Sequence, residues 1–342
     1  MQHDLVERAV NWVYRNGLAG DDLTIVWHAG EPLVLSPQWY SEAFARAGRA
    51  ARDGARILQA MQTNGMLIDD AWCDLFLAHH VSIGVSLDGP ASLHDARRRT
   101  RSGKGTHSQV MSGIATLKRR CVPFHVIAVI GEQTLAEPDA FVDFFIENDL
   151  RELGINIEEI EGENRKSTLE QPGIEQRFRA FFEHLLDRAN ASGRLSIREF
   201  WRACGAILEP ISSDGNEENT PFTIISVSAD GRIFTFSPEL LGQTDPVFGD
   251  FSIGRIDHTE LADILNEPRF KELHSQIIVG TEACRRSCAF FSVCGGGAPA
   301  NKWGELGDLR GTETLFCRLV KQQVTEAVLT RLDFALSQQR RP

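Results

Sequence analysis

Residues 23–32, LTIVWHAGEP, contain the pattern on which the first half of the chain is built. The stretch begins as a short apolar run rich in β-branched residues, which is typical of a buried strand. It continues as a polar, glycine-containing turn that ends in Glu31 and Pro32, and a helical pattern follows at about residues 37–53. The sequence therefore predicts a strand, a loop that carries a carboxylate and a helix, in that order.

The same alternation continues beyond this stretch. Apolar β-rich runs predict further strands at residues 56–63, 81–87, 123–130 and 153–159. Helical periodicity lies before and between the strands, at residues 2–17, 69–79, 107–119 and 138–149. Strands that alternate with helices form right-handed βαβ units with a parallel sheet. We therefore expect an α/β fold in which the parallel sheet is open or barrel-like.

The alternation ends past residue 160. A helix is expected at residues 174–192, followed by Gly193, and a polar loop covers residues 212–219. Residues 222–237 predict a β-hairpin that turns at Ala-Asp-Gly, and a last helix is expected from about 316 to 338. This change predicts two domains, which span residues 1–215 and 216–342.

The composition is typical of a globular protein with room for one large and one small domain. Of the 342 residues, 42% are hydrophobic and 24% are charged, and the net charge is −11. A chain this acidic does not favour binding to nucleic acid or to an anionic membrane. Its longest apolar stretches are too short to span a bilayer, and its charged N-terminus does not resemble a signal peptide. We expect a cytoplasmic protein.

Polar and glycine-rich residues follow the predicted strands at the ends where parallel sheets bind ligands. These segments are residues 28–32, 63–65, 86–90 and 158–159. The Glu31 carboxylate could accept hydrogen bonds from a ligand ammonium, and Ser86 with Arg98 could hold a carboxylate. A ligand with both groups is an amino acid. Loops of this kind are often polar without any ligand, so the pattern by itself leaves both interpretations open.

Four of the seven cysteines lie close together near the C-terminus, as Cys284-x3-Cys288-x5-Cys294 and Cys317. In a reducing compartment, clustered cysteines are more often metal ligands than disulfides. Four thiolates suit zinc or an iron–sulfur cluster. The glycines at 295–297 would let the backbone approach such a centre. The remaining cysteines, Cys73, Cys121 and Cys204, are isolated and are interpreted as small hydrophobic residues.

The motifs together resemble the radical S-adenosylmethionine enzymes, in the branch with a C-terminal SPASM or twitch domain. The matching stretches occur in the family's order: WHAGEPL (27–33), MQTNGMLID (61–69), SLDGPASLHDARR (86–98), GKGTHSQVMSGIATL (103–117) and CRRSCAFFSVCGGG (284–297) with Phe316-Cys317. LTIVWHAGEPLVL and INIEEIEGEN (155–164) look most similar to the glycine-rich-repeat peptide maturases, which form cyclophane cross-links.

The resemblance implies a partial parallel (β/α) barrel that lacks its first strand, and a small C-terminal iron–sulfur domain with a β-hairpin and a terminal helix. It implies an oxidoreductase that binds S-adenosylmethionine through the main site residues Gly30, Glu31, Pro32, Asn64, Ser86, Arg98, Val129 and Ile130. It also implies one auxiliary 4Fe–4S cluster on Cys284, Cys288, Cys294 and Cys317, because Ala298 stands where fuller SPASM domains have a further cysteine.

The family's CxxxCxxC loop, which holds the catalytic 4Fe–4S cluster, is not among these residues. It would follow a first strand upstream of the helix at residues 2–17. Two explanations are open: a misassigned or truncated start, or a degenerate relative without radical chemistry that binds a peptide and one metal centre. A parallel α/β enzyme with a structural zinc is a third alternative.

The expected activity is maturation of a ribosomally made precursor peptide, with a reductase as electron donor. A 5′-deoxyadenosyl radical would abstract hydrogen from the peptide, and a side-chain cross-link would form. No residue is assigned as the catalytic base. Glu158, Glu159 and Glu161 lie at the end of the last predicted strand, either as a base or substrate contact or as a solvated loop.

Overall fold

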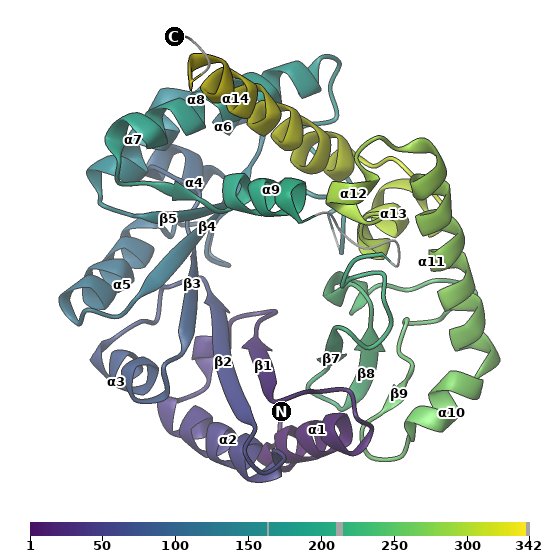
Figure 1. Ribbon diagram of the computed structural model, residues 1–342. Coiled ribbons are helices and arrows are strands. Elements are labelled where there is room, and N and C mark those ends of the chain that lie inside the picture. The colour runs from purple at the N-terminus through teal and green to yellow at the C-terminus, as the bar shows by residue number, and fades with distance from the viewer. Residues whose placement is uncertain (163, 210–214, 340–342) are drawn as a thin grey trace. The chain divides into compact units, whose positions relative to one another are not determined.

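The computed structural model describes residues 1–162, 164–209 and 215–339 of the chain (Figure 1). Apart from Met1, the chain forms two compact units: residues 2–156 with 185–198, and residues 157–184 with 199–342. The first is called the sheet unit and the second the cysteine unit. The domain boundary predicted near residue 215 directly follows residues 210–214, which lie outside the described residues, and it stays a prediction.

The described residues of the sheet unit include a six-stranded sheet in the order β1-β2-β3-β4-β5-β6. Parallel register is seen between β1 and β2, β2 and β3, β3 and β4, and β5 and β6. The predicted parallel α/β fold is confirmed. The strands are β1 (Asp22–Trp27), β2 (Arg56–Thr63), β3 (Ser82–Ser86), β4 (Phe124–Ile130), β5 (Glu152–Ile157) and β6 (Ser196–Ile197).

Helices cover one face of this sheet (Figure 1). Val6 and Val10 of α1 pack with Ala43 and Ala47 of α2 into a buried cluster, and alternate residues of β1 such as Ile25 pack against it. Residues of the strands that point the other way are more exposed, because their side chains alternate between the faces. The predicted helices appear as α1 (His3–Arg15), α2 (Pro37–Ala50), α3 (Asp70–His79), α5 (His107–Arg119) and α7 (Pro138–Glu147).

Several short elements were not predicted. They are η1 (Pro32–Val34), α4 (Ala91–Arg97), α6 (Glu132–Ala136) and α9 (Arg198–Leu208), in addition to β6. Most are too short to give a recognisable periodicity in sequence, so their positions depend on packing. The predicted helix at 174–192 is α8 (Ile174–Ser192).

The cysteine unit contains a small antiparallel sheet of β7 (Ile225–Val227), β8 (Arg232–Thr235) and β9 (Gly254–Arg255). The first two strands confirm the predicted hairpin. The expected last helix begins as a π-helix, Cys317–Gln323, and continues as α14 (Val324–Gln339). Between them lie η2 (Pro238–Leu240), α10 (Leu261–Asn266), α11 (Pro268–Ser287), α12 (Phe291–Cys294) and α13 (Pro299–Leu306).

Among the described residues, no helix has both the length and the apolar character that a membrane span requires.

Candidate functional site

The carboxylate of Glu31 connects the ends of β1 and β2. Its Oε1 accepts hydrogen bonds from the Leu33 amide at 2.9 Å and from the Thr63 hydroxyl at 2.7 Å. Its Oε2 accepts one from the Asn64 amide at 2.8 Å. The loop before it turns through two left-handed residues, Ala29 and Gly30, both with a φ of 66°. A non-glycine residue in this conformation is strained, and such strain is often found at functional sites.

Side chains on β2, β3 and β4 form a polar row on the sheet face opposite to the helices. Gln62 donates a 3.0 Å hydrogen bond to the Ser86 hydroxyl. Gly84 pairs in register with Gln62 on one side and His125 on the other. A Cβ on Gly84 would lie 2.0 Å from Gln62 Oε1 and 2.8 Å from His125 Nε2, so the glycine makes room for both. Sequence reasoning missed Gln62 and His125, although strand alternation places them on one face.

Asp88 connects the ends of β3 and β4 in the same way. Its carboxylate accepts two hydrogen bonds from Arg98, at 2.6 and 3.0 Å, and one from the Val129 amide at 2.9 Å. The Asp88 side chain is only 3% exposed, against 30% for Arg98. Arg98, which was predicted to bind a ligand carboxylate, therefore has a bidentate partner within the chain. Asp88 was not singled out from the sequence, although it directly follows a predicted strand.

His94 is a buried side chain that supports the loop of Asp88. It is fully buried, its Nδ1 accepts a 3.2 Å hydrogen bond from the Asp88 amide, and its Nε2 lies 3.0 Å from the Thr106 hydroxyl. Burial lowers the pKa of His94 to about 4, so the imidazole is neutral near pH 7. A neutral ring can accept at one nitrogen and donate at the other, as these contacts require.

The structure thus brings together most of the residues predicted at the strand ends. Glu31 meets Asn64, Ser86 meets Gln62, and Arg98 and Val129 meet Asp88. Pro32 and Ile130 are buried, whereas Gly30 is exposed. The role of each of these residues toward a ligand stays a prediction.

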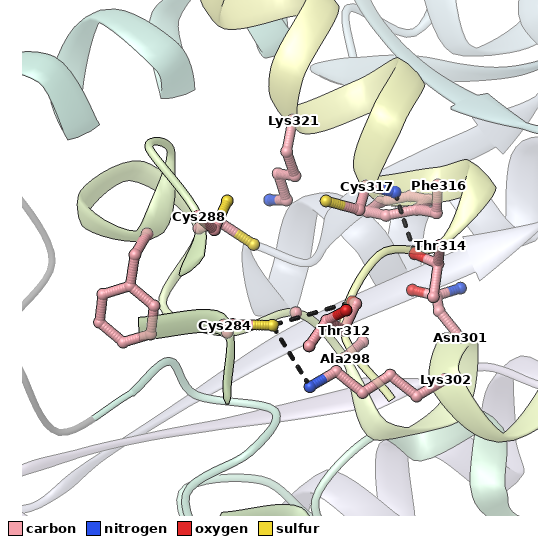
Figure 2. Close-up of a pocket in the computed structure, with 14 residues that line it drawn as sticks. Cys284, Cys288, Ala298, Asn301, Lys302, Thr312, Thr314, Phe316, Cys317 and Lys321 are labelled. Atoms are coloured by element: carbon pink, nitrogen blue, oxygen red, sulfur yellow. Dashed lines mark hydrogen bonds between the residues drawn. The ribbon is translucent and has the colours of Figure 1, made fainter. Parts of the chain in front are cut away.

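The second group of predicted residues lies in the cysteine unit. One hollow is lined by Cys284 in α11, Cys288 after it, Cys294 in α12 and Cys317 in the π-helix (Figure 2). Its empty volume of about 400 Å³ includes open solvent. π-Helical turns are rare and frequently mark functional sites. Here the π-helix also places Lys321, four residues after Cys317, at the wall of the same hollow.

Asparagine amides hold the loop that follows the third cysteine. Asn216 Nδ2 donates to the carbonyl of Cys294 at 2.9 Å, and Asn219 Nδ2 donates to that of Gly295 at 2.7 Å. Gly295, Gly296 and Gly297 all have positive φ values, of 67°, 100° and 75°, which only glycine adopts readily. The predicted glycine run therefore folds the chain sharply behind Cys294.

None of the four cysteines of the hollow is paired in a disulfide; Cys284 and Cys294 are buried, and Cys288 and Cys317 are partly buried. Burial, with smaller contributions from the neighbouring Cys294 and Cys288, raises the pKa of Cys317 to about 12. Burial also raises the pKa of Cys284. Thiolates become favourable in such a place when a metal centre supplies positive charge.

Two kinds of metal centre take four thiolates as ligands. A zinc ion lies about 2.3 Å from each sulfur, so its four thiolates nearly touch. A 4Fe–4S cluster takes one thiolate at each iron and needs room for its core. Within the described ranges, no three His, Cys, Asp or Glu side chains converge on a position for a single metal ion. The four thiols that line this one hollow match the ligands of an iron–sulfur cluster.

Glutamates form a further group in the cysteine unit. Asn301, which lines the hollow, donates a 2.6 Å hydrogen bond to Glu159. Burial, with a contribution from Glu161, raises the pKa of Glu159 to about 8, and burial with Glu239 and Glu218 raises that of Glu161 to about 7. Glu158 differs, since its carboxylate accepts a hydrogen bond of 2.7 Å from the Thr168 amide.

Comparison with known proteins finds a matching family and several relatives. Residues 1–145 match the radical SAM superfamily. An uncharacterized protein of Synechocystis is 38% identical over 338 residues, which cover 97% of this chain and 85% of that protein. A serine-type anaerobic sulfatase-maturating enzyme of Klebsiella aerogenes is 38% identical over 122 residues, which cover 36% of this chain and only 30% of that enzyme.

Among solved structures, the fold is similar to native anSMEcpe with bound AdoMet and the Kp18Cys peptide. The TM-score is 0.79 at 20% sequence identity, and the alignment covers 99% of this chain and 91% of that chain. At this identity the similarity shows a common fold.

Proposed function

The chain belongs to the radical SAM superfamily of enzymes, and on this basis we propose that it matures a ribosomally made peptide by cross-linking two of its side chains. The observation that carries the proposal is the hollow lined by four cysteines, which fits an auxiliary iron–sulfur cluster. A peptide substrate is supported by the structural relative that was solved with both AdoMet and a peptide.

The strand ends of the sheet unit are the proposed binding site for S-adenosylmethionine. The Glu31 carboxylate, held by Thr63 and the Asn64 amide, faces the ligand ammonium together with the loop of Gly30 and Pro32. Ser86 and Arg98 bind near the carboxylate, with Asp88 holding the Arg98 guanidinium in place. Val129 and Ile130 lie at the end of β4, where the adenine is proposed to bind. Groups fixed in advance by such contacts bind a ligand without loss of side-chain entropy.

A bound S-adenosylmethionine beside a reduced catalytic 4Fe–4S cluster would supply a 5′-deoxyadenosyl radical, which would take a hydrogen atom from a β-carbon of the peptide. The resulting carbon radical bonds to an aromatic ring carbon, and the ring then loses one proton and one electron. Cys284, Cys288, Cys294 and Cys317 are proposed to hold the cluster that receives this electron. A reductase supplies the electron that initiates the reaction. Glu159 and Glu161 stay candidates for the proton acceptor, and a structural role for them is the alternative.

The catalytic cluster of this scheme needs the thiolates of a CxxxCxxC segment as its ligands. Residues 1–342 contain no cysteines at that spacing. The alternative function is a relative without radical activity that binds a peptide and one metal centre.

Mass spectrometry separates the two functions. The product of the whole reading frame is expressed with a glycine-rich-repeat precursor peptide and a reductase, under anaerobic conditions. We expect the peptide to lose two hydrogen atoms for each cross-link, and one 5′-deoxyadenosine to form with it. If the iron-loaded protein binds the peptide but yields neither product, the maturase proposal is wrong and the non-catalytic alternative is supported.

A further inference from the structure

Lys302 of α13 is a buried lysine that faces the cysteines of the hollow (Figure 2). The residue is 3% exposed, and its ammonium donates a hydrogen bond to Cys284 Sγ at 3.7 Å. Within the part of the chain that the structure describes, the ammonium has no carboxylate partner at ion-pair distance. Its charge is therefore directed at a sulfur atom and at the space beside it.

Glycines near Lys302 leave space for its ammonium. Gly280 of α11 lies against the carbonyl of Leu309, and a Cβ on Gly280 would come within 2.4 Å of that oxygen and 3.0 Å of Lys302 Nζ. A Cβ on Gly297 would lie 3.7 Å from Lys302 Cε. A side chain at position 280 would therefore collide with the Leu309 carbonyl and crowd the ammonium beside Cys284.

An ammonium that is removed from water is costly unless an anion compensates its charge. The groups that could do so here are the sulfur atoms of the hollow, once they are thiolates. Thiolates bound to an iron–sulfur core carry residual negative charge, and this charge increases when the core gains an electron. A fixed positive charge beside them stabilises the reduced state more than the oxidised state.

We propose that Lys302 is a positioning residue for the cluster: its ammonium donates a hydrogen bond to the Cys284 thiolate and raises the reduction potential of the iron–sulfur centre. The inference rests on the cluster assignment made under the proposed function. It explains how a cluster enclosed by four thiolates is tuned to accept an electron, since hydrogen bonds to ligand sulfurs are among the factors that set such potentials.

The experiment compares K302M with K271M in the full chain after anaerobic reconstitution. Both variants remove one lysine charge, but Lys271 is an exposed residue of α11. Iron content is measured first, and the midpoint potential is then measured by redox titration followed by electron paramagnetic resonance. We expect both variants to load iron as the wild type does. In K302M the equilibrium constant for reduction should fall at least tenfold, a shift of about 59 mV to lower potential for a one-electron couple, whereas K271M should match the wild type.

The outcomes separate this inference from the cluster assignment. If K302M and K302Q load wild-type amounts of iron and keep its potential, the inference is wrong although the cluster stands. If neither variant loads iron, Lys302 is needed to assemble the centre rather than to tune it, and the inference is also overturned. If residues 1–342 with both Cys284→Ala and Cys317→Ala still load wild-type amounts of iron, the cluster assignment fails first.

Discussion

Gly113 of α5 lies against the carbonyl oxygen of Gly65, in the loop after β2, so closely that a Cβ on Gly113 would come within 2.2 Å of that oxygen. The contact supports the Thr63-Asn64-Gly65 loop, whose Asn64 amide binds Glu31. Helix packing and the arrangement of the candidate ligand site are therefore linked through one backbone contact.

Replacing Gly113 with alanine should destabilise the fold, because a carbonyl oxygen cannot move aside as a flexible side chain can. We expect G113A to lower the free energy of unfolding by about 1–3 kcal/mol. Urea denaturation followed by circular dichroism measures this change. G48A is the matched control, since Gly48 is a helical glycine of α2 with nothing within 4 Å of its added Cβ. It should raise stability by about 0.5–1 kcal/mol, and a similar gain in G113A would contradict the contact.

Removal of the Asp88 carboxylate should also be costly. D88A leaves the Arg98 guanidinium and the Val129 amide without their acceptor at a buried position. We expect a loss of about 3 kcal/mol in the free energy of unfolding. The matched control is D22A, which breaks a similar bidentate pair with Arg56 at an exposed position. Its loss should be much smaller, because solvent and salt screen exposed ion pairs. Equal losses in the two variants would show that burial of the Asp88 pair is unimportant.

Glu31 should contribute its charge to the binding of S-adenosylmethionine. E31Q keeps the size of the side chain but removes the charge, so a charge-assisted hydrogen bond to the ligand ammonium becomes a neutral one. We expect the dissociation constant, measured by equilibrium dialysis, to increase about tenfold. D53N removes one charge from an exposed loop residue and should bind like the wild type. Unchanged affinity in E31Q would exclude the proposed ammonium contact.

Glu159 should make the stability of the chain depend on pH. Burial raises its pKa to about 8 from an ordinary value of 4.5, so the folded chain keeps a proton that the unfolded chain has already released. The stabilisation from this group is complete below about pH 4.5 and is lost as the pH rises through about 8. E159Q should remove this part of the pH dependence and gain stability relative to the wild type as the pH rises.

Urea denaturation between about pH 5 and pH 9 measures the effect of E159Q. The control is E272Q, which removes an exposed glutamate of α11 and should keep the wild-type profile. A wild-type chain whose stability does not fall across this range would contradict the raised pKa of Glu159.

Much of the sheet unit could be predicted because its signals are local. The strand expected at residues 56–63 is β2 with the same bounds, and the helix expected at 174–192 is α8 with the same bounds. Both segments are long enough for the period of their apolar residues to be recognised. The helix α4 has only seven residues and follows a proline, so it offered no such period.

The candidate site was predicted only in part, because its partners are distant in sequence. Glu31 and the four clustered cysteines stand out by their position and spacing, but Gln62, Asp88 and Lys302 do not. Asp88 meets Arg98 and Val129 only when the ends of β3 and β4 are adjacent. Lys302 reaches Cys284 because Gly280 leaves space for its ammonium.

The order of the strands and helices, the polar residues at the strand ends and the spacing of the cysteines could all be inferred from the amino-acid sequence, since each depends on neighbours along the chain. The tertiary structure alone decided which carboxylate holds which guanidinium, and which sulfur atom receives a buried ammonium. Those pairings join residues 10 and 18 positions apart, and they exist only where packing excludes water and makes an unpaired charge costly.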